Sequence, residues 1–287
     1  MHRTDTDSMN IGGRSFLRHG RTYVVGILNL TPDSFSDGGK WNRLDQALRH
    51  VEEMVQAGAD IIDIGGESTR PGHVMISDQE EIERVATVIE TVKANFDTPV
   101  SLDTYKGSVA SAGISAGADL INDIWGLKFD DNIAGVISKS GLPCCLMHNR
   151  KDAVYRNFMQ DLTEDLMESI VLAENAGIES SRIILDPGIG FAKSYGQNLE
   201  AIGRMEDLMA LGFPLLLGCS RKSVIGLTLD LPVEQRIEGT LATTVVAVMK
   251  GCMFVRVHDV KENVRAIRMT EAILNSVAAD GHRKGGI

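Results

Sequence analysis

Short apolar runs alternate with longer amphipathic segments along most of this 287-residue chain. At six places a helix-like segment ends in a glycine and an apolar run begins: Gly58, Gly117, Gly141, Gly177, Gly212 and Gly251. A glycine just past a helix is a common C-cap, because it has no Cβ to oppose a left-handed backbone. Most of these glycines are roughly 24 to 40 residues apart, which suits one helix and one strand per unit.

The runs between the helical segments predict eight strands, at residues 23–29, 60–64, 100–103, 120–123, 144–148, 183–186, 214–218 and 253–258. Most are short and largely apolar, and several are β-branched, as is typical of parallel strands buried on both faces. Strands that alternate with helices in this way predict an α/β fold. Eight such units predict a closed (β/α)8 TIM barrel in a single domain.

The clearest helix is predicted over residues 77–96. Its apolar stripe consists of Ile82, Val85, Val88, Ile89 and Val92. Ser77 and Glu80 at its start have the spacing of a capping box, in which each residue satisfies a backbone N–H of the other.

Residues 1–22 do not follow the repeat and are predicted to form an N-terminal extension. We expect residues 15–23 to form a small hairpin that turns near His19 and Gly20 and covers the N-terminal mouth of the barrel. The barrel is assigned to residues 23–278, and residues 279–287 to a C-terminal tail.

Composition narrows the classes of function. Hydrophobic residues make up 43% and charged residues 24%, which is ordinary for a globular domain. A net charge of −10 argues against a nucleic-acid or anionic-membrane surface. No apolar run approaches the roughly 20 residues that span a bilayer, and no secretory signal is visible, so we expect a cytoplasmic protein. The four cysteines are expected to be reduced core residues.

Polar residues gather where the predicted strands end, which is where barrels of this kind carry their active sites. They are Asn29, Glu67, Asp103, Asn122, His148, Asp186, Lys222, Arg256 and His258. A lone Asp after a strand more often caps a helix, and Asp123 and Asp130 are expected to do so. His148 is equally well explained as a structural group or as a ligand. The whole set, with its carboxylates, amides and cations, predicts a polar heterocycle bound beside an anion.

Four of these side chains suit the heterocycle. Asp103 and Asp186 can accept hydrogen bonds from a ring that carries amino and N–H groups. Asn122 can donate and accept at once, and Lys222 can donate to a ring carbonyl or nitrogen.

The anion is matched by three other side chains. Arg256 offers a planar fork for phosphate oxygens or a flat face for stacking. His258 can add a phosphate contact, and Asn29 is a neutral oxygen ligand suited to a Mg²⁺ held mainly by substrate phosphates. No zinc motif, dinucleotide fingerprint or nucleophile elbow occurs in the sequence, which favours displacement without a covalent enzyme intermediate.

Two long segments closely resemble signatures of the dihydropteroate synthase family. They are residues 26–39 (GILNLTPDSFSDGG) and residues 63–72 (DIGGESTRPG). The later segments 186–191, 220–223 and 256–259 match in the same order. The resemblance extends from about Tyr23 to the last helix, with one conservative departure at Leu30, where valine is common.

The resemblance implies roles position by position. The pterin-binding set is Asp103, Asn122, Asp186 and Lys222. The pyrophosphate and Mg²⁺ set is Arg256, His258 and Asn29. The p-aminobenzoate side consists of Phe35, Thr69, Arg70, Pro71 and Ser223. Asp37 is implied to stabilise a developing cation, and the catalytic set is then Asp37, Lys222, Arg256 and His258.

The activity implied by the resemblance joins 6-hydroxymethyl-7,8-dihydropterin pyrophosphate to p-aminobenzoate. The products are 7,8-dihydropteroate and pyrophosphate, in folate biosynthesis, and the course is similar to an SN1 reaction. The family also implies Mg²⁺ as cofactor, sulfonamides as inhibitors and a homodimer built through outer helices late in the chain.

Three other functions compete with this one. A corrinoid-linked methyltetrahydrofolate methyltransferase resembles the fold and the pterin site, but it should lack the segments 69–72 and 220–223 and has no use for a pyrophosphate site. A non-catalytic pterin-binding homologue is disfavoured by the complete set of polar residues. A fused enzyme that also makes the pterin pyrophosphate would need a second domain, for which the chain has no room.

Overall fold

A computed structural model describes residues 8–30, 40–68 and 74–283 of the chain, with side chains described for 8–30, 44–68 and 74–276. Its main sheet has eight parallel strands in the order β8-β7-β6-β5-β4-β3-β10-β9. The strands are β3 (Tyr23–Asn29), β4 (Ile61–Gly65), β5 (Val100–Asp103), β6 (Leu120–Asp123), β7 (Cys144–Met147), β8 (Ile183–Asp186), β9 (Leu216–Leu217) and β10 (Phe254–Val257). A parallel bridge between Leu185 and Leu215 joins the two edges, which confirms the predicted (β/α)8 barrel.

The strand bounds follow the prediction closely. Those of β3, β5, β6 and β8 are the predicted ones. The seventh predicted strand, residues 214–218, is shorter, since β9 has two residues and Leu215 contributes an isolated bridge.

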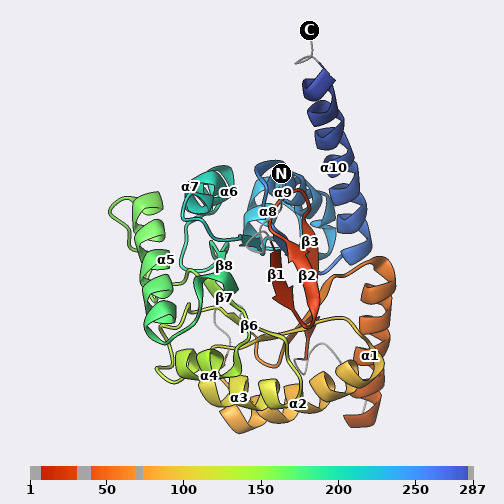
Figure 1. Cartoon of the computed structure of the whole chain (residues 1–287), viewed down its shortest axis with the longest axis vertical. Coiled ribbons are helices and arrows are strands. Elements are labelled where there is room, and N and C mark those ends of the chain that lie inside the picture. Colours follow the sequence, from red (N-terminus) through yellow and green to blue (C-terminus); the bar gives the residue numbers. More distant parts are fainter. Residues whose placement is uncertain (1–7, 31–39, 69–73, 284–287) are drawn as a thin grey trace.

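Helices form a ring around the strands (Figure 1). They are α1 (Lys40–Ala57), α2 (Asp78–Asn95), α3 (Gly107–Ser115), α4 (Ile133–Ser140), α5 (Phe158–Asn175), α6 (Tyr195–Gly203), α7 (Met205–Met209), α8 (Ser223–Leu229), α9 (Ile237–Lys250) and α10 (Val260–Arg283). Helix α10 runs through the predicted domain boundary at residue 278. Within the described part of the chain, no helix is long and apolar enough to cross a membrane.

The N-terminal hairpin lies earlier in the chain than we predicted. Strands β1 (Ser8–Ile11) and β2 (Arg14–Leu17) pair antiparallel, with Ile11 opposite Arg14. The turn is therefore at Gly12 and Gly13, not near His19 and Gly20. Gly12 and Gly13 both have positive φ, 58° and 78°, and two left-handed residues in a row make the two-residue turn that matches the twist of a hairpin.

The hairpin closes the N-terminal mouth of the barrel, as predicted. Met9, Ile11 and Phe16 are buried in one apolar cluster with inward-facing strand residues that include Tyr23 and Phe254. The ring of Phe16 lies 4.8 Å from that of Tyr23 and 5.9 Å from that of Phe254, measured between centroids. Figure 1 shows the hairpin at the centre of the ring of helices. The floor of the barrel is thus made of side chains supplied by the extension.

Helix signals in the sequence are mostly confirmed. All six predicted cap glycines have positive φ. Ser77 Oγ accepts a 3.2 Å hydrogen bond from the N–H of Glu80, but the Glu80 carboxylate pairs with Arg84, so the reciprocal half of the capping box is replaced by an ion pair. In the predicted stripe, Ile82 is the one residue that is only partly buried.

The two aspartates that we expected to cap helices behave differently. Asp130 accepts a 2.6 Å hydrogen bond from the N–H of Gly107, the first residue of α3, and caps that helix from another loop. Asp123 instead accepts from the N–H groups of Trp125 and Leu127, at 2.8 and 2.7 Å, and fixes the turn after β6. The prediction of a helix cap was therefore wrong for Asp123, because the chain turns tightly before any helix begins.

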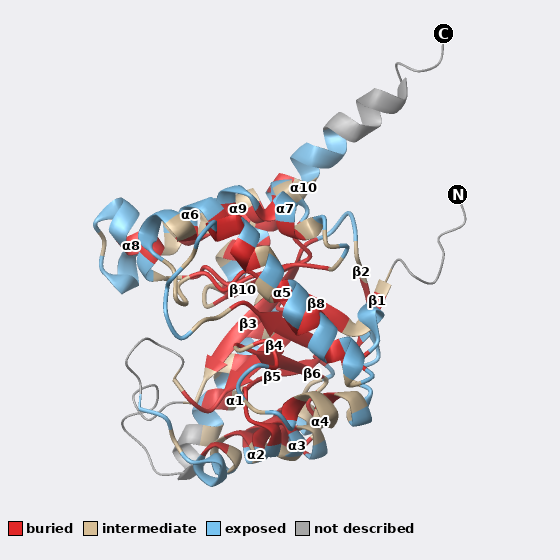
Figure 2. Ribbon diagram, turned by 90° about the vertical axis from the view of Figure 1, so that its left-hand side faces the viewer, coloured by how far each residue is buried: buried red, intermediate tan, exposed pale blue. Residues whose placement is uncertain are grey.

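Burial follows the barrel pattern. Figure 2 shows the strands almost wholly buried and the exposed residues on the outer faces of the helices. Polar side chains buried in the interior therefore require a specific explanation, since each costs free energy unless it is paired.

Candidate active site

The strand register places several predicted site residues at one level of the barrel. Asn29 is opposite Gly65, Gly65 is opposite Asp103, and Asp103 is opposite Asn122. Because the strands are parallel, their carboxyl ends meet at the same mouth. The site is thus assembled from adjacent strands, one residue from each.

Arg256, from the last strand β10, reaches across this mouth to two acids. Its Nε donates a 2.6 Å hydrogen bond to Asp63 Oδ2, and its Nη2 donates a 2.8 Å bond to Asp103 Oδ2. The amide of Asn122 donates to Asp63 Oδ2 at 3.4 Å. Arg256, Asp103 and Asn122, predicted as site residues, are therefore brought together, and Asp63 joins them.

Two carboxylate oxygens of this group have no hydrogen-bond partner among the described residues. Asp63 Oδ1 and Asp103 Oδ1 are buried and accept no hydrogen bond from the described residues. A buried acceptor without a donor is costly, by about 1 to 3 kcal/mol. Both oxygens are therefore suited to a ligand that supplies N–H donors.

The charges in the group are strongly coupled. Burial raises the pKa of Asp103 to about 7, against the opposing effect of the Arg256 guanidinium, while the charge of Asp63 raises it further. Burial disfavours the charge of Arg256, but Asp63 and Asp103 hold the pKa of the guanidinium above its ordinary value. Asp103 can thus change protonation near neutral pH, when a ligand supplies or removes a donor, while Arg256 stays charged.

Asp186 and Lys222 form the second half of the site. Burial raises the pKa of Asp186, opposed by the charge of Lys222 and by the hydrogen bond from the N–H of Gly188. Burial also lowers the pKa of Lys222, opposed mainly by Asp186. Lys222 Nζ donates to the carbonyl of Ile189 and lies 4.8 Å from the centroid of the Phe191 ring. This cation and this acid each stabilise the charged form of the other in a buried setting.

Gly218 lies beside Asp186, Lys222 and Arg256. A Cβ on Gly218 would lie 3.5 Å from Asp186 Oδ2, 3.8 Å from Lys222 Nζ and 3.9 Å from Arg256 Cβ. A larger side chain would extend into the region bounded by all three groups. Glycine at this position therefore places no side chain among the three groups.

His258 and Ser220 are linked at the end of β10. His258 Nδ1 lies 3.0 Å from Ser220 Oγ, and Ser220 Oγ accepts a 3.2 Å bond from the N–H of His258. Arg221, between Ser220 and Lys222, pairs with Asp259. Ser223 is exposed at the first residue of α8. Neighbouring residues of the segment 220–223 therefore make different contacts: Ser220 contacts His258, Arg221 pairs with Asp259, and Ser223 is exposed to solvent.

Asn29 lies next to the acidic part of the mouth. A Cβ on Gly65 would be 3.8 Å from Asn29 Oδ1 and 3.7 Å from Asp103 Oδ2. Among the described residues, no group of three or more His, Cys, Asp and Glu side chains could hold a metal ion by itself.

His148 is a structural group. It is 2% exposed, and its Nε2 lies 2.8 Å from Asp165 Oδ2 while its Nδ1 lies 2.7 Å from Lys193 Nζ. Both ring nitrogens are therefore occupied by protein partners, which settles the open choice against a ligand role.

Five predicted site residues lie outside the described part of the chain. They are Phe35, Asp37, Thr69, Arg70 and Pro71. Their roles stay predictions.

Comparison with known proteins decides the family. A family model described as "Pterin binding enzyme" matches residues 25–258. A dihydropteroate synthase of Clostridium beijerinckii is 59% identical over 267 residues, which cover 93% of this chain and 99% of the relative. One of Bacillus subtilis is 51% identical and covers 93% and 91% of the two chains. This chain belongs to the dihydropteroate synthase family.

Solved structures of the dihydropteroate synthase family share the barrel. The Clostridium difficile enzyme, crystallised in the presence of pteroic acid, has a TM-score of 0.87 at 49% identity and covers 89% of this chain and 98% of its own. The Xanthomonas albilineans enzyme with 4-aminobenzoic acid has a TM-score of 0.89 at 39% identity, with 93% and 98% covered. The predicted fold and family are confirmed.

Sequence reasoning missed one residue of this candidate site. Asp63 was part of a signature but received no role, although it is fully buried and binds Arg256. The signal was present in the sequence: a single acid stands inside the apolar strand β4. A charge at such a position must be paired, which points to a cation elsewhere in the barrel.

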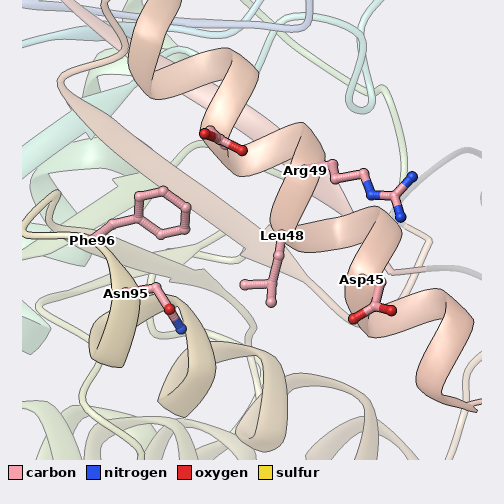
Figure 3. Close-up of a pocket in the computed structure, with 6 residues that line it drawn as sticks. Asp45, Leu48, Arg49, Asn95 and Phe96 are labelled. Atoms are coloured by element: carbon pink, nitrogen blue, oxygen red, sulfur yellow. The ribbon is translucent and has the colours of Figure 1, made fainter.

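A separate surface pocket lies outside this site. It has a volume of about 480 Å³ and is lined by Asp45, Leu48, Arg49, Glu52, Asn95 and Phe96, from α1 and the end of α2. Figure 3 shows Leu48 and Phe96 facing the space between these two segments. None of the lining residues belongs to the strand ends, so this pocket is distinct from the candidate active site.

Proposed function

We propose that this chain condenses 6-hydroxymethyl-7,8-dihydropterin pyrophosphate with p-aminobenzoate to give 7,8-dihydropteroate and pyrophosphate. The observation that best supports this proposal is the buried group of Arg256, Asp63 and Asp103 at the barrel mouth. Two carboxylate oxygens of this group have no hydrogen-bond donor in the described part of the chain. A pterin ring carries amino and N–H donors along one edge and a carbonyl beside them, which complements acids on one side and Lys222 on the other.

The pterin would bind against Arg256, beside the acids to which the guanidinium is hydrogen-bonded. The open oxygens of Asp63 and Asp103 would accept from the ring, and Asn122 would donate and accept. Gly218 places no side chain beside Asp186, Lys222 and Arg256, and the guanidinium of Arg256 would stack on the flat heterocycle. A ring N–H donated to Asp103 would favour its carboxylate form, since burial otherwise raises its pKa to about 7.

The pyrophosphate would lie toward Arg256, His258 and Asn29. Among the described residues, no group of three or more His, Cys, Asp and Glu side chains could hold a metal ion, and the neutral oxygen of Asn29 fits a Mg²⁺ held mainly by substrate phosphates. When bound, Mg²⁺ would neutralise charge that builds up on the leaving pyrophosphate. Arg256 and His258 would bind the same oxygens from the protein side.

The reaction would begin with heterolysis of the bond between the pterin methylene carbon and the pyrophosphate oxygen. The electron pair leaves on that oxygen, where fixed cations stabilise it. The amine nitrogen of p-aminobenzoate then forms the new bond to the methylene carbon and loses a proton to water or pyrophosphate. Orientation of the weakly basic amine supplies much of the remaining rate enhancement.

The arylamine is proposed to bind outside the pterin, near Ser223 at the start of α8. Phe35, Thr69, Arg70 and Pro71 are assigned to the same side, and Asp37 to the developing cation, by the family resemblance. A Yersinia pestis dihydropteroate synthase, 42% identical over 93% of this chain, is known in complex with a sulfonamide drug. This supports a sulfonamide-sensitive arylamine site here.

Pyrophosphate release tests the proposed function. Release from the pterin pyrophosphate with Mg²⁺ should depend on p-aminobenzoate and match the dihydropteroate formed. Pterin binding without release would favour the binding-only homologue. Folded Lys222→Ala and Asp186→Ala variants should have no measurable turnover, and near-normal activity in either would remove that residue from the mechanism.

A homodimer through the late outer helices is the proposed assembly. Large apolar side chains are exposed there: Leu227 and Leu229 on α8, Met249 on α9, and Met269, Ile273 and Leu274 on α10. These helices are neighbours, since α9 contacts both α8 and α10, and large apolar side chains exposed on neighbouring helices favour an interface. Sedimentation of a Met249→Lys/Met269→Lys variant should show monomers, whereas Val154→Lys, which changes an exposed side chain elsewhere, should stay dimeric.

The proposed location is the cytoplasm. All four cysteines are buried free thiols, and burial raises the pKa of Cys144 and of Cys252 to about 12. Unpaired thiols are typical of reducing compartments.

A further inference from the structure

Lys193 is a partly buried lysine whose amino group is hydrogen-bonded to neutral acceptors, and burial lowers its pKa to about 7. Its Nζ donates to His148 Nδ1 at 2.7 Å, to the Gly188 carbonyl at 2.9 Å and to the Phe191 carbonyl at 3.0 Å. No described carboxylate lies within ion-pair distance of it. An ammonium bound in this way supplies three directed donors and no direct charge pairing. Its geometry therefore fixes the three acceptors relative to one another.

The acceptors belong to two segments that follow neighbouring strands. His148 comes directly after β7, and residues 188–191 come after β8. The segments approach so closely that a Cβ on Gly188 would lie 1.9 Å from the His148 carbonyl oxygen. Gly188 has a φ of 68°, a left-handed conformation that glycine accepts without strain. Lys193 thus joins the two segments at their tightest contact.

The turn over residues 188–191 is in direct contact with the proposed pterin-binding groups. The N–H of Gly188 donates a 2.7 Å hydrogen bond to Asp186 Oδ1. The Ile189 carbonyl accepts from Lys222 Nζ, and the Phe191 ring lies 4.8 Å from the same atom. Every group that Lys193 holds in this turn is therefore at most one residue away from a contact to Asp186 or Lys222.

His148 is itself held in the orientation that Lys193 needs. Its Nε2 faces Asp165, which also binds Arg150 Nε at 2.5 Å and Nη2 at 3.0 Å. With Nε2–H donating to Asp165, Nδ1 presents its lone pair to Lys193. Arg150, Asp165, His148 and Lys193 form one continuous chain of contacts that ends at the turn.

We propose that Lys193 is a positioning residue for the pterin site, which sets the turn at residues 188–191 and through it the placement of Lys222 and Asp186. This inference rests on the proposed function, because it assumes that the heterocycle contacts Lys222 and Asp186. Lys193 touches neither reactant in this scheme.

A pair of variants tests the proposal. Lys193→Met removes the donors and keeps an unbranched side chain of similar length. Lys193→Gln supplies two N–H donors without charge. These donors should hold the turn in part if hydrogen bonds to the neutral acceptors, and not the charge of the lysine, position it. Lys128→Met is the matched control: Lys128 donates to the carbonyl of Asp165 at 2.7 Å and pairs with Glu168, both on α5, and does not contact the turn.

The measurements are the KM values of the two substrates, the Kd of 6-hydroxymethylpterin by calorimetry, and the melting temperature. Lys193→Met should weaken pterin binding and raise the KM of the pterin pyrophosphate by about tenfold, with the KM of p-aminobenzoate changed less than about twofold. Lys193→Gln should recover part of the pterin affinity, and Lys128→Met should resemble the wild type.

The outcomes separate the possible failures. A lower melting temperature with unchanged pterin affinity in Lys193→Met would overturn the positioning role and leave a structural one. An equal rise in both KM values would also contradict it, because the turn contacts the pterin groups alone. If the wild-type chain bound no pterin, the proposed function itself would fail, and no variant would be needed to learn so.

Discussion

Arg256 Nε lies 2.6 Å from Asp63 Oδ2, and Asp63 is fully buried in the middle of strand β4. A buried acid of this kind is stable only with a partner, and Arg256 has its Nη2 on Asp103 at the same time. The guanidinium is therefore oriented by two fixed acids before any ligand arrives. Asp63 and Asp103 thus fix the guanidinium near the carboxyl ends of the strands.

Asp63→Asn should damage both stability and pterin binding. The substitution keeps the shape and removes the charge, so Arg256 keeps a single acid, Asp103, as its ion-pair partner. Breaking a buried pair costs about 3 to 5 kcal/mol, which urea denaturation would register as a lower free energy of unfolding. The KM of the pterin pyrophosphate should rise in the folded protein. Asp97→Asn, at an exposed position, should change neither quantity, and a wild-type result for Asp63→Asn would show that Asp103 alone orients Arg256.

His148 should make the protein less stable toward acid. Burial lowers its pKa from 6.5 to about 4, despite the opposing hydrogen bond to Asp165. The unfolded chain therefore binds the proton more tightly between these values. The stability is fully present above pH 6.5 and is lost as the pH falls toward 4, by about 3 kcal/mol in total.

The effect of His148 has to be measured as a difference between the wild type and a variant, because buried acids change the stability with pH in the opposite direction. Burial raises the pKa of Asp123 to about 6 and that of Asp103 to about 7. The contribution of such groups to the stability of the folded protein is lost as the pH rises. The free energy of unfolding of His148→Gln, subtracted from that of the wild type at each pH, should isolate the slope between pH 4 and 6.5. A flat difference across this range would mean that His148 is not held neutral.

The sequence predicted the barrel because its signals are local. The glycine that follows six of the helices and the short apolar run after each of these glycines depend on backbone preferences within a few residues. The parallel arrangement then predicts which polar residues lie together, because the carboxyl ends of parallel strands meet at one mouth of the barrel. Asn29, Asp103 and Asn122 fall on one level for that reason.

The rest depends on contacts between distant segments. Asp63 and Arg256 are 193 positions apart, and the direction in which the guanidinium folds is decided by packing in three dimensions. The hairpin was misplaced because two turn signals compete near it. The pair Gly12 and Gly13 makes the tighter two-residue turn, and the apolar residues Met9, Ile11 and Phe16 on either side of it are the ones that fit the barrel floor.

Lys106→Met should strongly destabilise the protein. Lys106 Nζ lies 2.6 Å from Glu67 Oε2, 2.8 Å from Glu81 Oε2 and 2.8 Å from the Ile76 carbonyl, and all three charged side chains are at most 5% exposed. Burial by itself would raise the pKa of Glu67, but the hydrogen bonds from Lys106 and Tyr105 lower it. Without the lysine, two buried acids lose their cation, at a cost of about 3 to 5 kcal/mol.

Two comparisons sharpen this prediction. Adding Glu81→Gln to Lys106→Met should recover part of the loss in chemical denaturation, since one of the two uncompensated charges is removed. Lys128→Met, which breaks a half-exposed pair with Glu168, should cost less than about 1 kcal/mol. Glu67 and Ile76 also flank residues 69–73, so the KM of p-aminobenzoate should rise in folded Lys106→Met. Equal losses in the lysine variants would contradict a special role for the buried cluster.

Phe16→Ala should lower stability and leave the chemistry intact. The Phe16 ring packs on Tyr23 and Phe254 at the N-terminal floor, and deletion of a buried phenylalanine side chain costs about 3 to 5 kcal/mol. The proposed substrate groups lie at the opposite mouth, at the carboxyl ends of the strands. Thermal unfolding should therefore occur at a lower temperature, while both KM values stay near those of the wild type below the transition. Arg14→Ala, an exposed change in the same hairpin, serves as the control. If Phe16→Ala raised the KM of the pterin pyrophosphate without altering the melting temperature, the floor would have to be coupled to the site, and the hairpin could no longer be assigned to stability alone.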